Sequence, residues 1–132
     1  MEELSYKAKV AVVKLLGEIL NADKIVHEKE VKYLDEVIKS LNLDENYKEE
    51  VDALLTLEAL STIRILSVDQ KRGIAKMMGK MIVVDKDINY NEVKLYNAFC
   101  DSCDIEKDFN VEDYSDVTLS GPFVNPEDIM NI

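Results

Sequence analysis

The sequence predicts an all-α, single-domain bundle of about six helices with an internal duplication. Three observations support this fold class. The 132 residues include four glycines and two prolines, and both prolines lie near the end, which favours long helices joined by short turns. Apolar residues recur three and four positions apart along most of the chain. A short acidic motif occurs twice, each time between an apolar helical run and an amphipathic one.

The duplication pairs residues 15–45 with residues 77–107 at a constant shift of 62 positions and without gaps. The identical pairs are Gly17/Gly79, Asp23/Asp85, Lys24/Lys86, Glu30/Glu92, Val31/Val93, Lys32/Lys94 and Ser40/Ser102. The apolar pattern of the two segments matches as well. Self-similarity at a fixed shift indicates that one helical hairpin is used twice.

In the first half of the chain, residues 3–21 are predicted to form a helix, because their apolar side chains fall on one face. A turn over residues 22–27 follows, and the apolar spacing resumes in a second helix over residues 28–41. A third helix starts next, and either Asp44 or Asn46 can cap it.

In the middle of the chain, Thr56 is expected to mark a break or a bend, after which the helical pattern continues to Leu66. Because this segment is apolar on several sides, it is predicted to be the central and most buried helix. Ser67 and Gln70 fit a capping box that starts the next helix, which runs to Ile82.

The second copy of the hairpin lies in this next helix and beyond it. Gly79 repeats Gly17, and close approach of two helices is the expected reason for both glycines. The second acidic turn covers residues 84–89, and a last helix covers residues 90–103.

The chain divides into a helical domain, residues 1–104, and an acidic C-terminal tail, residues 105–132. Residues 104–132 hold eight acidic side chains and one lysine, so the tail carries much of the net charge of −11. The tail also holds too many apolar residues for a purely solvated segment. We expect a mostly irregular chain, extended or irregular at residues 118–123, that packs on the domain or on a partner. The second arrangement would form a homodimer through the tail.

Charge and hydropathy exclude two classes of partner. Nucleic-acid binding requires a basic face, and this chain is acidic. Its apolar runs are far shorter than the ~18–20 residues of a membrane span, so membrane insertion is not expected. The start, Met1-Glu2-Glu3, lacks the basic and apolar regions of a signal peptide, and a cytoplasmic location is therefore expected.

The acidic turns have two interpretations, and the first is structural. Glu30 lies three residues after His27, and Glu92 lies three residues after Asn89, which is the spacing of a capping box. Asn89 is a good N-cap, whereas His27 is a poor one. The aspartate that opens each turn would accept backbone N–H bonds, and this interpretation needs no ligand.

The second interpretation is a divalent-cation site. Hard cations take oxygen ligands, and the two turns offer Asp23, Glu30, Asp85, Asp87 and Glu92. The acidic alternation in the second turn resembles the start of an EF-hand loop. That loop needs glycine at its sixth position and glutamate at its twelfth, and this chain has tyrosine at both, which excludes an EF-hand.

The first acidic turn and the helices on either side of it resemble a motif of a known family. A hydrophobic helix, then Ala-Asp-x-x-Val-x-x-x-Glu at residues 22–30, then an amphipathic helix is similar to the TerB-like family of tellurite-resistance proteins. The fold of that family also occurs at the N-terminus of a membrane-anchored DnaJ-type co-chaperone. The resemblance covers roughly residues 5–105, and family members commonly have glycine where this chain has Lys24 and Lys86.

The resemblance implies an all-helical domain whose two acidic turns lie near each other. It also implies a metal-binding or scaffolding role in stress responses around the membrane. The acidic positions that it implies are Asp23, Glu30, Asp85 and Glu92.

Two further features carry potential chemistry. Cys100 and Cys103 form a CxxC pair, but a zinc site needs four ligands and the chain has one histidine and no other cysteine. A redox pair sits at a helix N-terminus, whereas this pair falls near a C-terminus, so reduced, buried thiols are expected. His27 is either a metal ligand beside Asp23, a proton switch or a solvated residue.

No nucleophile–base set and no cofactor-binding loop is evident in the sequence, so the protein is predicted not to be an enzyme. The leading hypothesis is an interaction or scaffold module that acts on a protein partner in an envelope or metal stress response. The alternative is a divalent-cation-binding protein that uses the two acidic turns.

Overall fold

The computed structural model describes residues 3–22, 27–84, 87–105 and 118–120. The described residues form α1 (Tyr6–Leu20), α2 (Glu28–Leu41), α3 (Tyr47–Ala53), α4 (Thr56–Arg64), α5 (Val68–Val83), β1 (Asp87–Asn89), α6 (Tyr90–Cys103) and β2 (Thr118–Ser120). This is the all-α, single-domain bundle that the sequence predicted. Within the described ranges, every helix is too short or too polar to cross a bilayer.

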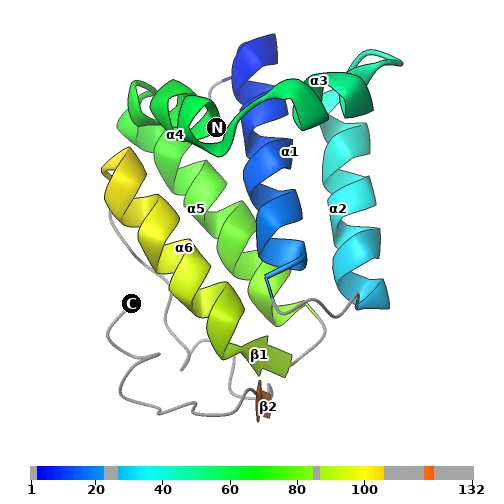
Figure 1. The fold of residues 1–132 in the computed structure, drawn as a ribbon, viewed down its shortest axis with the longest axis vertical. Coiled ribbons are helices and arrows are strands. Elements are labelled where there is room, and N and C mark those ends of the chain that lie inside the picture. The colour runs from blue at the N-terminus through cyan, green and yellow to red at the C-terminus, as the bar shows by residue number, and fades with distance from the viewer. Residues whose placement is uncertain (1–2, 23–26, 85–86, 106–117, 121–132) are drawn as a thin grey trace.

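The bundle is built around α1. Figure 1 shows α6, α5, α1 and α2 side by side, with α3 and α4 toward the end of the bundle opposite β1. α1 packs against each of the other five helices of the described part. Nine of its fifteen residues are buried, and most of them are alanine, valine or leucine. α1 is therefore the central helix.

The prediction that residues 57–66 form the most buried helix is wrong. One side of α4 faces the core, but Leu57 is 76% exposed and Ile65, just after the helix, is 84% exposed. The prediction failed because apolar residues on several sides of a helix do not ensure that another segment of the chain covers each of those sides. The buried residues of α4 are Ala59, Leu60 and Ile63.

Side-chain caps mark where α1 and α5 begin. Ser5 precedes α1, and its Oγ accepts a hydrogen bond from the Ala8 N–H at 3.2 Å. The predicted capping box before α5 is confirmed: the Gln70 N–H donates to Ser67 Oγ at 3.1 Å, and the Ser67 N–H donates to Gln70 Oε1 at 3.0 Å. Asn46 precedes α3 but makes no capping bond with its side chain.

The helix bounds follow the repeat. α2 and α6 start 62 positions apart and end 62 positions apart, and α1 and α5 also start 62 positions apart. Asn42 after α2 and Asp104 after α6 both adopt the left-handed conformation, with φ of 53° and 56°. These residue types tolerate that conformation better than most and commonly end helices there. α5 ends 63 positions after α1, so the match in bounds is complete for α2 and α6 and differs by one residue for the helices that precede them.

The expected reason for Gly17 is wrong. A Cβ added at Gly17 would meet nothing within 4 Å, so no neighbouring helix approaches this position closely. Gly17 instead lies in an open groove of about 300 Å³, which Val13 and Val51 also line. Gly79 is buried.

A short parallel strand pair ties part of the tail to the bundle. Ile88 of β1 is buried and lies opposite Leu119 of β2. The sequence had predicted irregular or extended chain at residues 118–123, and the first three of these form β2. Residues 106–117 and 121–132, where the rest of the tail prediction falls, lie outside the described residues.

Candidate functional site

The helix ends that flank the two acidic turns lie at one end of the bundle, which we call the acidic end. α1 and α5 end there, and α2 and α6 start there (Figure 1). Among the predicted site residues, Asp23 and Asp85 lie outside the described residues, and so does the side chain of Asp87. Glu30 and Glu92 are described, and the geometry of the site at this end is given by these two residues.

Glu30 and Glu92 are buried, with 0% and 1% of their surface exposed. They are the buried charged residues of the described part of the chain. Each is the third residue of its helix, where backbone N–H groups and the helix dipole favour a negative charge. Burying a carboxylate is costly unless it is paired or hydrogen-bonded. The burial of Glu30 and that of Glu92 therefore impose the same requirement, which is that each carboxylate be compensated by polar interactions.

The residues that cap these two helices differ. His27 makes no side-chain capping bond, and its Nε2 lies 3.8 Å from Glu30 Oε1. Asn89 accepts a hydrogen bond on Oδ1 from the Asn91 N–H at 2.8 Å. The prediction that Asn89 caps its helix and that His27 is a poor cap is confirmed. When His27 is protonated, its positive charge lies next to a buried carboxylate.

The described part of the acidic end does not contain a full set of metal ligands. Within residues 3–22, 27–84, 87–105 and 118–120, no three His, Cys, Asp or Glu side chains lie close enough to hold a metal ion. Divalent cations such as Ca²⁺ need six or more oxygen ligands. The cation hypothesis therefore depends on Asp23, Asp85 and Asp87, together with backbone oxygens and water.

The two cysteines have the properties expected of core residues. Cys100 and Cys103 are buried free thiols near the end of α6. Cys103 Sγ lies 3.6 Å from the carbonyl oxygen of Leu60, to which it donates a weak hydrogen bond. Burial raises the pKa of the Cys103 thiol to about 11, although Lys71 and Arg64 partly oppose this. Cys103 is therefore protonated at neutral pH, which disfavours thiolate chemistry.

A second candidate site lies on the outer side of α4. It is a groove of about 530 Å³ that we call the α4 face. Its row of exposed side chains, Leu57, Ser61 and Ile65, has a spacing of four residues. Leu55 and Val68, which flank α4 in the chain, are exposed as well. The residues of the α4 face are Ser5, Lys7, Leu57, Glu58, Ser61, Thr62, Ile65 and Leu66.

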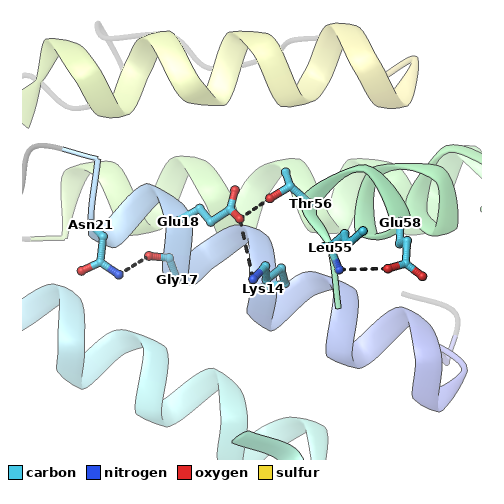
Figure 2. Close-up of polar contacts among 7 residues, drawn as sticks. All are labelled: Lys14, Gly17, Glu18, Asn21, Leu55, Thr56 and Glu58. Carbon is cyan, nitrogen blue, oxygen red and sulfur yellow. Dashed lines mark hydrogen bonds and ion pairs between the residues drawn. The ribbon is translucent and has the colours of Figure 1, made fainter. Parts of the chain in front are cut away.

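Polar contacts hold the start of α4 in place (Figure 2). Thr56 Oγ1 donates a hydrogen bond to Glu18 Oε1 of α1, and the same oxygen lies 4.0 Å from Lys14 Nζ. The Leu55 N–H donates to Glu58 Oε1 at 3.1 Å, which satisfies one donor at the start of α4. The α4 face is therefore presented by a helix whose position is fixed from the core side.

α4 runs antiparallel to α1. The start of α4 is bonded to the last turns of α1, as Figure 2 shows. Beyond the other end of α4, Gln70 Nε2 donates to the carbonyl oxygen of Glu3, just before α1, at 3.1 Å. Lys7, near the start of α1, therefore borders the C-terminal half of α4, whereas Glu58 lies in its N-terminal half.

The sequence prediction missed the α4 face. The signal was present, because Leu57, Ser61 and Ile65 form a helical row separate from the residues that face the core. Because α4 has apolar residues both in this row and on its core side, it was predicted to be buried on several sides. The packing of α1 against α4 shows which of the two rows the core covers.

Comparison with known proteins supports the fold. No protein-family model matches the sequence, and no curated protein matches it. The structure is similar to the crystal structure of a protein of unknown function, PG1108 from Porphyromonas gingivalis W83, with a TM-score of 0.68 and 18% sequence identity. The match covers 81% of this chain and 84% of that chain. At this level of identity the two proteins share a fold, and the comparison shows nothing beyond it.

Proposed function

We propose that the protein is a non-enzymatic interaction module and that the α4 face is its docking surface for a protein partner. The observation that carries the proposal is the exposure of Leu57 and Ile65 beside a groove of about 530 Å³. A large aliphatic side chain left in water forgoes about 1.5–3 kcal/mol of burial free energy. Grouped exposed apolar residues with a polar rim are typical of protein-binding surfaces.

Two properties of the site support a binding role. The α4 face is preformed, because Thr56, Glu18 and the buried side of α4 hold the helix in place. A preformed surface loses less conformational entropy when a partner binds. Its polar rim, Ser5, Lys7 and Glu58, offers hydrogen-bonding groups around an apolar centre, which is the usual anatomy of an interface.

The cellular setting of the proposal follows the resemblance to the TerB-like family. That resemblance supports a scaffold that acts in an envelope or metal stress response, and the cytoplasmic location rests on the acidic start of the chain, which does not resemble a signal peptide. The protonated thiol of Cys103 supports a non-enzymatic role, because the CxxC pair is the one nucleophilic motif that the sequence offers.

The proposal is tested by a charge placed on the α4 face. Leu57→Asp puts a carboxylate in the exposed row, in the first turn of α4, where the helix dipole tolerates it. Ala98→Asp, at an exposed position of α6, is the matched control. Affinity capture from cytoplasmic and membrane extracts should give a protein that binds the wild type and the control but not Leu57→Asp. Identical capture by all three proteins would contradict the proposal.

The second candidate function is divalent-cation binding at the acidic end of the bundle. The observation that favours it is the burial of Glu30 and Glu92 in the first turns of α2 and α6, which start at the same end of the bundle. A cation bound near either residue would offset part of the cost of burying its carboxylate. Asp23, Asp85 and Asp87 would supply further oxygens.

Calorimetric titration of chelator-treated protein with Ca²⁺, Mg²⁺, Mn²⁺ and Zn²⁺ tests this candidate. Binding heat and a rise in melting temperature that Asp85→Ala abolishes would support it. Asp35→Ala, at an exposed position of α2, is the control and should bind as the wild type does. The absence of heat with all four metals at millimolar concentration would remove the candidate.

A further inference from the structure

We infer that the partner of the α4 face is a second copy of this chain, which packs α4 antiparallel against the same helix across a twofold axis. This inference rests on the proposed function, because it names the occupant of the proposed docking surface. Three features of the face carry it: the order of side chains along its exposed row, the placement of its two charges, and its neutrality within an acidic protein.

The exposed row has nearly the same order of side chains in both directions along the helix, with a large aliphatic residue on each side of Ser61. Leu57 and Ile65 lie four residues before and four residues after Ser61, and all three side chains are exposed. A twofold axis through Ser61 would place Leu57 of each protomer against Ile65 of the other. The small serine at the crossing point lets the two helix axes approach to about 8–10 Å. This is the self-complementarity that an isologous interface requires.

The charges of the face pair under the same symmetry. Glu58 lies in the N-terminal half of α4, and Lys7 borders its C-terminal half. In the antiparallel arrangement, the N-terminal half of one α4 meets the C-terminal half of the other. Each Glu58 would therefore lie toward the partner's Lys7, twice per dimer. A parallel arrangement would instead bring like charges together.

The charge balance of the face also fits a second copy. The chain has a net charge of −11, so two copies repel each other over most of their surfaces. The α4 face contains one acidic and one basic residue and is neutral. Identical molecules of this protein can make contact there without bringing unbalanced negative charge together.

The mass of the full chain in solution, measured by light scattering across a concentration series, tests the inference. The wild type and Ala98→Asp should approach twice the chain mass of 15.1 kDa. Leu57→Asp and Ile65→Asp should stay near the mass of one chain, and circular dichroism should show that both remain helical. Ile65 lies after the last residue of α4, so its substitution does not interrupt the helix.

Oxidative cross-linking tests the register. Ser61→Cys lies on the proposed axis and should form disulfide-linked dimers, whereas Ala98→Cys on α6 should not. The native cysteines are buried, so they do not interfere. The inference is overturned by a wild type that is monomeric at every concentration, by a dimer that survives both aspartate substitutions, or by cross-linking at position 98 rather than 61. A monomeric wild type whose captured partner is lost in Leu57→Asp would overturn this inference and leave the proposed function standing.

Discussion

Glu30 and Glu92 lie 62 positions apart in the chain and occupy the same place in the fold, the buried third residue of α2 and of α6. Their helices start at the same end of the bundle (Figure 1). Because both helices bury a glutamate at their third residue, we infer that this side chain contributes to the packing of each helix start, whether or not a cation binds nearby. His27 Nε2 lies 3.8 Å from Glu30 Oε1, which distinguishes the first hairpin from the second.

The first prediction concerns Glu30. Replacing Glu30 with alanine should lower the free energy of unfolding by about 1–3 kcal/mol, because it leaves a void at a fully buried position and removes the carboxylate beside His27 Nε2. Glu28→Ala, at an exposed position in the same helical turn, should cost less than about 1 kcal/mol. Urea unfolding measures both changes. Equal effects would show that the Glu30 side chain is solvated.

The second prediction concerns the start of α5. Ser67→Ala removes the oxygen that accepts the Gln70 N–H and should destabilise the protein by about 1 kcal/mol. Asn46→Ala is the control at the start of α3, where the side chain makes no capping bond, and it should change stability by less than about 0.5 kcal/mol. Thermal unfolding of the two variants at one pH compares them. A larger cost at Asn46 would contradict the capping geometry.

The third prediction concerns Gly17. Gly17→Ala should raise the free energy of unfolding by about 0.5–1 kcal/mol, because alanine favours the helix and its Cβ meets no atom within 4 Å. Urea unfolding measures the change. A loss of stability would mean that the groove beside Val13 and Val51 is closed in solution.

The fourth prediction concerns alkaline pH. The pKa of Cys103 is raised from 9.0 to about 11, so the folded state favours the protonated thiol. Its contribution to stability is complete below pH 9 and is lost as the pH rises toward 11, by about 2 kcal/mol. The stability difference between wild type and Cys103→Ala should therefore shrink over this range.

Tyr6 provides an internal check on the alkaline measurement. Its hydrogen bond to Glu50, 2.7 Å long, raises the pKa of Tyr6 to about 12. Tyr6 is present in both the wild type and Cys103→Ala, so its titration cancels in the difference.

At pH 8 the native thiols should react with a disulfide reagent only after urea is added. Fast reaction in the native protein would contradict the burial of both cysteines.

Much of the fold was predictable from local sequence features. The predicted helices at 28–41 and 90–103 have the observed bounds, and the capping box of Ser67 and Gln70 forms as expected. These features depend on residues within one or two turns of each other, and their effects are set by backbone hydrogen bonding and side-chain spacing. The buried pair Cys100 and Cys103 followed from the same spacing.

The candidate sites were predicted less well. Glu30 and Glu92 were named as site residues because the motif repeats, but their complete burial was not predicted. The α4 face was missed because the segment that ends at Leu66 was predicted to be buried on several sides, whereas Leu57, Ser61 and Ile65 are exposed. In both cases the unknown was which neighbouring segment covers a given side chain, and spacing within one helix does not contain that information.

By itself, the sequence determined the all-α class, the bounds of the helices at 28–41 and 90–103 and the capping box before α5, because caps, breakers and apolar periodicity act between residues close in the chain. The tertiary structure decided that α1 rather than α4 is central, that Gly17 opens into a groove, and that β2 pairs with β1. It also decided which side of α4 stays exposed. These outcomes depend on contacts between segments far apart in the chain, where side-chain volumes from several helices together set which surface is covered.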